Sequence, residues 1–174
     1  MLLEHEFTVI DGERVDEAMA VARFVARVHA LGPLSPASPE LQVRLLQEVK
    51  AVAQHIDGSS EAGAAFAYGR RVLYEVPHHW SLAAIILRPG QHTDPHDHGG
   101  WGCAATVQGV ERNRRFIHDD SGNLMLFDER DFSPGTGYVF DAADIHQPVG
   151  ADPRGVTVAL HFLVCERHKE VSHA

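Results

Sequence analysis

Two histidines separated by one residue, His96 and His98, are the side chains of this sequence best suited to chemistry. They follow the turn-forming stretch that opens with Pro89-Gly90, in a segment interpreted as the start of a strand. Side chains two residues apart on a strand point to the same face, so both imidazoles can bind one ion. The spacing therefore predicts a metal site, and the intervening Asp97 is expected to point away from it.

Two amphipathic helices are expected before the strand-rich part of the chain. Apolar residues recur at helical spacing over Val15–Val28, and Leu31-Gly32-Pro33 ends this first helix. Ser38 as N-cap and Pro39 at the first helical position begin the second helix, which Asp57-Gly58 ends. The apolar faces of both helices are expected to pack against the rest of the domain.

From Tyr68 onward, short β-rich runs alternate with turns, a pattern typical of a sandwich or a barrel. No repeat or linker indicates a second domain, so we expect one domain over residues 1–174. Its helical part covers about 1–60 and its β-barrel about 68–165. The expected strands are residues 71–75, 81–87, 101–108, 114–118, 124–127, 136–140 and 156–164.

The spacing Gly90-x5-His96-x-His98 resembles the first motif of the cupins. Cupins usually carry a glutamate a few residues later, but Gly102 or Cys103 stands in that window here. The segment 135–148, with its glycine turn and His-x-Pro, is similar to the second cupin motif. The resemblance implies a mainly β fold, the cupin double-stranded β-helix (a jelly-roll barrel) preceded by two helices. It also implies a metal site made of three histidines, His96, His98 and His146.

Three neutral imidazoles suit iron, nickel, copper or zinc better than magnesium or calcium. They leave the +2 charge of the ion uncompensated and up to three coordination positions open. Such a site attracts anionic ligands, and a thiolate is an obvious one because a metal deprotonates a bound thiol.

The stretch His96-Asp97-His98-Gly99-x-Trp101-Gly102 also resembles the thiol dioxygenases, the cysteine dioxygenase-like branch of the cupins. The similarity runs from about residue 68 to 164, and this stretch is similar to bacterial members, including those acting on 3-mercaptopropionate. It implies that three histidines bind non-haem iron(II) and that a thiol is converted to a sulfinic acid with O2.

A second match is Tyr68-Gly69-Arg70, which is similar to the Tyr-x-Arg segment of cysteine dioxygenases. There the arginine holds the substrate carboxylate and the tyrosine hydroxyl assists. A guanidinium is always charged and matches a carboxylate with two parallel hydrogen bonds. Tyr68 and Arg70 are therefore the expected substrate-binding residues, and Tyr68 is also a candidate catalytic residue.

The last strand departs from the family pattern. Ser-x-His-x-Tyr, a hydrogen-bonded relay beside the iron, is replaced by Ala159, His161 and Leu163. His161 is the expected catalytic donor or base, but it must find a different partner, because neither alanine nor leucine forms side-chain hydrogen bonds. The lost bulk favours a substrate larger than cysteine. In some relatives a cysteine beside the site cross-links to the tyrosine. Counting forward from His98 puts Cys103 at that position and counting back from Gly109 puts Gly102 there, and the bacterial pattern Trp101-Gly102 favours Gly102.

Composition excludes several classes of protein. The formal net charge of −9 argues against a nucleic-acid partner, and no apolar run approaches the roughly 20 residues that span a bilayer. The first residues do not resemble a secretion signal. Only two cysteines, Cys103 and Cys165, are present, which favours a reducing compartment, so a cytoplasmic location is expected.

These observations predict an iron(II)-dependent enzyme that oxidises a small carboxylate-bearing thiol to a sulfinic acid, with the thiol and O2 as its partners. Nickel or zinc are the other candidate metals, and a homo-oligomer is left open. The missing relay residues favour an alternative: another metal-dependent cupin enzyme, for dicarbonyl cleavage or isomerisation, or a metal- or ligand-binding cupin without turnover. Position alone suggests Tyr138, Trp80, His78 and His79 for the mouth of the site.

Overall fold

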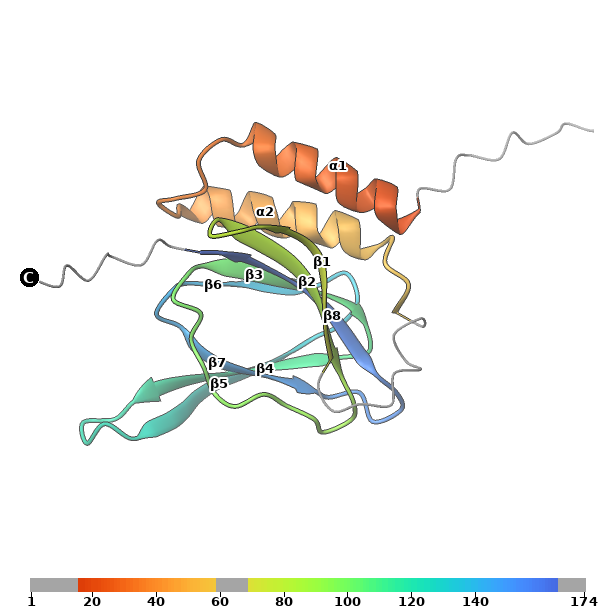
Figure 1. Ribbon diagram of the computed structural model, residues 1–174. Helices are drawn as coiled ribbons and strands as arrows, with labels where there is room; N and C mark the ends of the chain where they lie inside the picture. The colour runs from red at the N-terminus through yellow and green to blue at the C-terminus, as the bar shows by residue number, and fades with distance from the viewer. Residues whose placement is uncertain (1–15, 59–68, 166–174) are drawn as a thin grey trace, which may run out of the picture.

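A computed structural model describes residues 16–58 and 69–165, in which two helices precede eight strands (Figure 1). The helices are α1 (Glu17–Ala30) and α2 (Pro39–Ala53), and neither is long and apolar enough to cross a membrane. The strands are β1 (Gly69–Val76), β2 (Trp80–Leu87), β3 (Gly102–Gln108), β4 (Glu111–His118), β5 (Leu124–Phe132), β6 (Gly137–Phe140), β7 (Ile145–Gly150) and β8 (Thr157–Val164).

Both helices begin at a side-chain cap. Asp16 accepts a hydrogen bond from the Met19 amide at 2.8 Å, and Ser38 accepts one from the Leu41 amide at 3.2 Å. The predicted start of α2 at Ser38-Pro39 is thus confirmed. The helix ends at Ala53, earlier than the sequence indicates, because the chain turns there and Ile56 reaches the core from the segment that follows.

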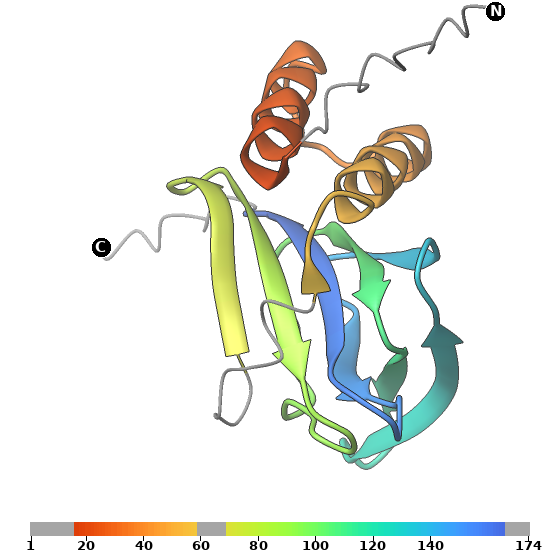
Figure 2. The same ribbon diagram turned by 90° about the vertical axis from the view of Figure 1, so that its right-hand side faces the viewer.

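The strands form two antiparallel sheets that face each other as a jelly roll. The five-stranded sheet has the order β1-β2-β8-β3-β6, and the three-stranded sheet has the order β5-β4-β7. The helices lie over the outer face of the five-stranded sheet, and the three-stranded sheet lies on its opposite side (Figures 1 and 2). The expected class, mainly β with two leading helices, is therefore confirmed.

The main hydrophobic core lies between the helices and the five-stranded sheet. On β8, Leu160, Phe162 and Val164 pack with Phe24 of α1 and Leu45 of α2. Because successive side chains of a strand alternate between faces, the residues between them face the inside of the barrel. The fold is thus stabilised mainly outside the barrel, which leaves its interior available for polar side chains.

Candidate metal centre

His96 and His98 lie in the connection between β2 and β3, while His146 lies on β7 of the other sheet. The expectation that the pair opens a strand is wrong, because His96 forms only an isolated bridge with His146. Two backbone hydrogen bonds of 2.9 Å join these residues, from each amide to the other carbonyl oxygen. The connection is thereby held against β7, and this bridge, not strand alternation, brings the imidazoles together.

The three imidazoles form a group that could hold a metal ion. Their candidate ligand atoms all lie within 4.8 Å of one another, and His98 Nε2 is 2.9 Å from His146 Nε2. Two nitrogens that are each about 2.1 Å from one ion, at right angles, lie about 3 Å apart. Among the described residues, no other set of histidine, cysteine or acidic side chains gathers in this way.

Two of the three rings are oriented by hydrogen bonds at Nδ1. His146 Nδ1 is 3.0 Å from Asn113 Oδ1, and His96 Nδ1 is 2.8 Å from the Asp94 carbonyl oxygen. A proton on Nδ1 donated to such an oxygen leaves Nε2 as the free ligand atom. The spacing did not single out Asn113, although Glu111-x-Asn113 is a strand pattern that places both side chains on the same face of β4.

The protein environment keeps two of these rings neutral. Burial, followed by the neighbouring His161, His98 and His96, lowers the pKa of His146 from 6.5 to about 2. Burial, followed by His96 and His161, lowers the pKa of His98 from 6.5 to about 4. A neutral imidazole is the form that binds a metal, so the site is ready for an ion at neutral pH.

A cavity of about 100 Å³ opens beside the histidines. Arg70 of β1 lines it together with His96 and His98. The neighbouring Arg71 points to the opposite face of β1 and pairs with Glu17 of α1 at 2.6 Å. Of these two arginines, Arg70 is therefore the one that faces the cavity. The other residues of the cavity wall are Ser81, Ala83, Ile85, Thr93, Phe140, Pro148, His161 and Leu163. Tyr68 lies outside the described residues.

His161 lines the same cavity and has a partner that sequence reasoning missed. Its Nε2 is 3.0 Å from Glu111 Oε2, while the Tyr138 hydroxyl donates to Glu111 Oε1 at 2.7 Å. Ala159 and Leu163 offer no hydrogen bond, so the expectation that His161 finds another partner is confirmed. Tyr138 therefore lies inside the barrel and is bonded to a buried carboxylate.

The two residues proposed for the cross-link position lie on opposite faces of β3. Cys103 faces the helices in the main core, where burial raises the pKa of its thiol. Gly102 pairs with Leu163 and Phe140, which both line the cavity. A side chain there would overlap the Phe162 carbonyl oxygen and the Phe140 ring, so no cysteine fits at that position.

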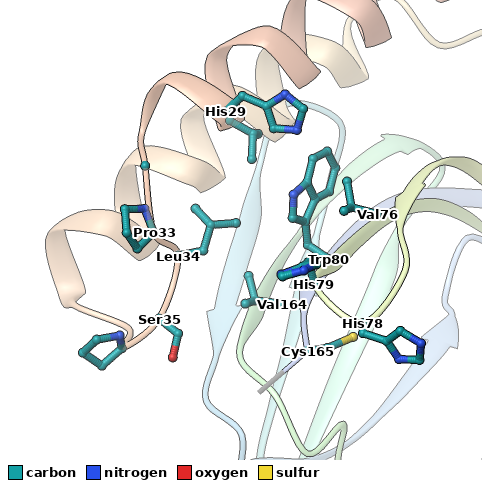
Figure 3. Close-up of a pocket in the computed structure, with 13 residues that line it drawn as sticks. His29, Pro33, Leu34, Ser35, Val76, His78, His79, Trp80, Val164 and Cys165 are labelled. Atoms are coloured by element: carbon teal, nitrogen blue, oxygen red, sulfur yellow. The ribbon is translucent and has the colours of Figure 1, made fainter. Parts of the chain in front are cut away.

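A second, larger cavity of about 990 Å³ lies at the end of the five-stranded sheet near the α1–α2 connection (Figure 3). His78, His79 and Trp80 line this cavity, together with His29 and Cys165. They do not line the cavity beside His96, so the suggestion that they surround its mouth is wrong. The described histidines here do not form a metal-binding group, so size does not identify the chemical site.

Comparison with known proteins agrees with the architecture. The sequence matches no family model, and it matches no curated protein. A conserved Streptococcus pyogenes protein of unknown function is similar in structure, with TM-score 0.50, 14% identity, and coverage of 65% of this chain and 88% of that chain. The two facing antiparallel sheets have the jelly-roll architecture of a cupin fold.

Two further solved structures are similar at a comparable level. A cupin superfamily protein from Desulfitobacterium hafniense has a TM-score of 0.47 and 15% identity, covering 66% of this chain and 87% of that chain. KdgF from Halomonas sp. has a TM-score of 0.46 and 18% identity, covering 58% of this chain and 81% of that chain. Identities this low concern the fold alone, so function must be argued from the site.

Proposed function

We propose that this protein is a non-haem iron(II) dioxygenase that oxidises a small carboxylate-bearing thiol to a sulfinic acid with O2. The observation that supports this proposal most directly is the shared cavity of Arg70, His96 and His98. An arginine fork and a group of neutral imidazoles in one cavity suit a ligand with two anionic ends. A thiol that also carries a carboxylate is such a ligand.

The donor set fits iron(II). His96, His98 and His146 would hold the ion, and three nitrogen ligands leave positions open for other groups. Iron(II), when bound, supplies the redox chemistry and the binding positions for a thiolate and O2. Nickel and zinc accept the same donors, so the metal is part of the proposal.

The protein side chains supply binding and orientation. Arg70 has no ion pair with any described residue and would hold the substrate carboxylate in two parallel hydrogen bonds. Ala83 and Leu163 make part of the wall apolar, which suits the carbon chain between the two anionic ends. The cavity of about 100 Å³ favours a compact substrate, and Leu163 in place of tyrosine favours one somewhat larger than cysteine.

In an alternative proposal, the protein binds a metal at the same histidines but does not act on a thiol. Ala159 and Leu163 lack the hydroxyls of the thiol dioxygenase relay, which favours another metal-dependent cupin reaction such as dicarbonyl cleavage or isomerisation. A cupin that binds a metal or a ligand without turnover is the third candidate. In that case a bound small molecule would be recovered unchanged.

The test is oxygen consumption by iron-loaded protein with a panel of thiols that differ in length and in the presence of a carboxylate. We expect thiol-dependent oxygen uptake and a sulfinic acid product, detected by mass spectrometry, with carboxylate-bearing thiols preferred. Metal analysis of the purified protein accompanies the assay. Tightly held zinc or nickel, with no oxygen uptake for any thiol, would support the alternative instead.

A further inference from the structure

Glu111 is a buried carboxylate that links the two sheets of the barrel. Its side chain lies on β4 of the three-stranded sheet and is 1% exposed. Its two oxygens meet Tyr138 of β6 and His161 of β8, both in the five-stranded sheet, at 2.7 and 3.0 Å. Glu111 is not among the grouped metal-ligand side chains, so its role is to be sought in these two contacts.

The directions of these hydrogen bonds follow from the chemistry of the three groups. Burial, followed by the charge of Glu111, raises the pKa of Tyr138 well above its ordinary value, so its hydroxyl keeps its proton and donates. An ionised carboxylate only accepts hydrogen bonds. The nitrogen of His161 that faces Glu111 must therefore carry a hydrogen, which places a proton on Nε2.

The second nitrogen of His161 is left for the cavity. His161 lines the cavity with Arg70 and His98, and its Nδ1 makes no hydrogen bond with any described residue. Its neighbours across the sheet are Ala83 and Ala104, whose side chains cannot form a hydrogen bond with the ring. A neutral ring with its proton on Nε2 presents a lone pair at Nδ1.

We propose that Glu111, fixed by Tyr138, is a positioning residue that holds His161 with its proton on Nε2, so that Nδ1 accepts the proton of a thiol entering the cavity. The S–H bond breaks, the proton moves to Nδ1, and the electron pair stays on sulfur as a thiolate. The imidazolium so formed remains paired with the Glu111 carboxylate. This assignment to a thiol rests on the proposed function, whereas the tautomer of His161 does not.

In the thiol dioxygenase pattern, a serine and a tyrosine on the last strand form the hydrogen-bonded relay with the histidine. Here Glu111 and Tyr138 would form the corresponding relay with His161 from other strands. Ala159 and Leu163 remove those hydroxyls from β8. A carboxylate is a stronger hydrogen-bond acceptor than a neutral hydroxyl. The exchange therefore gives Nε2 of His161 a strong acceptor for its proton.

The first test is ¹⁵N NMR of the imidazole nitrogens in full-length, metal-free protein at mildly alkaline pH, with His161→Gln used to assign the signals. We expect a neutral His161 ring with its proton on Nε2. In Glu111→Gln, the amide accepts at one atom only and donates at the other, so we expect a mixture of the two tautomers. A proton on Nδ1 in the unsubstituted protein, or an unchanged tautomer in Glu111→Gln, overturns the proposal.

The second test is steady-state kinetics of the iron-loaded protein with the best thiol of the panel. We expect Glu111→Gln to lower kcat by about tenfold to a hundredfold with little change in KM, as for a misplaced base. The matched control is Thr106→Val, which removes another buried hydroxyl hydrogen bond, to the Phe132 carbonyl oxygen, without touching His161. Equal losses of kcat in the two variants overturn the positioning role.

The two tests separate failure of this inference from failure of the proposed function. If no thiol supports oxygen uptake, the proposed function fails, yet the NMR measurement still decides the tautomer of His161. If oxygen uptake occurs and the proton is found on Nδ1, the proposed function stands and the role of Glu111 is refuted. The unsubstituted protein alone decides this point, even if Glu111→Gln fails to fold.

Discussion

Which nitrogen of each imidazole carries a proton decides what this site can bind. Asn113 and the Asp94 carbonyl oxygen accept at Nδ1 of His146 and His96, whereas Glu111 accepts at Nε2 of His161. The first two rings thereby offer Nε2 to a metal, and the third offers Nδ1 to the cavity. Histidine spacing in the sequence predicts which rings are used, but not these partners, because they come from backbone carbonyls and from other strands.

Asn113 should tune the affinity for metal. In Asn113→Ala, His146 loses the acceptor for its Nδ1 proton, and we expect affinity for zinc or iron(II) to fall by about tenfold to a hundredfold. Asn113→Asp keeps an acceptor and should retain most of the affinity. Competition titration with a chromogenic chelator measures this, with the exposed Asn123→Ala as control. Equal affinity in Asn113→Ala and the unsubstituted protein contradicts the role of this contact.

Arg70 and Arg71 offer a comparison between two adjacent arginines on opposite faces of β1. Loss of a charge-assisted, two-pronged contact costs about 1.5–3 kcal/mol, so Arg70→Gln should raise KM for a carboxylate-bearing thiol about tenfold to a hundredfold. The same substitution should leave activity on cysteamine, which has no carboxylate, unchanged. Oxygen-uptake kinetics measure both values.

Arg71→Gln is the matched control, because it breaks the ion pair with Glu17 of α1 and leaves the cavity wall intact. It should change stability rather than KM. If Arg71→Gln raises KM as much as Arg70→Gln does, Arg70 is not the carboxylate clamp.

Strand alternation explains how far the sequence could predict this molecule. All seven expected strands are present, because alternating apolar runs and turn residues are local signals. The same alternation separates Arg70 from Arg71 and Gly102 from Cys103. One strand, β7, was missed, and β4 begins at Glu111 instead of Arg114. Polar residues such as Glu111 and His146 face inward there, and inward polar residues hide the usual apolar signal of a buried strand.

On the last strand, β8, the same alternation decides which side chains line the cavity and can contact the substrate. Leu163 lies beside Ser81 and Gly102 and lines the cavity. Leu163→Tyr and Leu163→Phe both add a ring to a cavity of about 100 Å³, so both should lower activity on the longer thiols of the panel. Only Leu163→Tyr adds a hydroxyl, so only it should change activity on cysteine. Unchanged activity of both variants on all thiols would remove β8 from the site.

In the whole molecule, the main core lies outside the barrel and a group of neutral imidazoles lies inside it. These imidazoles make the stability of the folded protein depend on pH. The pKa of His98 is lowered to about 4 and that of His146 to about 2, both from an ordinary value of 6.5. Below about pH 6.5 the unfolded chain therefore binds protons at these rings that the folded protein does not. The free energy of unfolding of the metal-free protein should be greatest above this pH. It should fall as the pH drops toward 4. Below about pH 4 the loss of stability caused by His98 levels off, whereas the loss caused by His146 continues.

Urea unfolding of the metal-free protein between pH 8 and pH 4.5 measures this slope. His98→Gln removes one titrating ring, so its free energy of unfolding should fall less steeply with acid than that of the unsubstituted protein. Zinc binds only the folded protein with its rings neutral, so it should raise stability most above about pH 6.5 and progressively less in acid. Parallel pH curves for His98→Gln and the unsubstituted protein would mean that the His98 imidazole does not cause this pH dependence. The site would then be more open to solvent than the hydrogen bonds around His146 indicate.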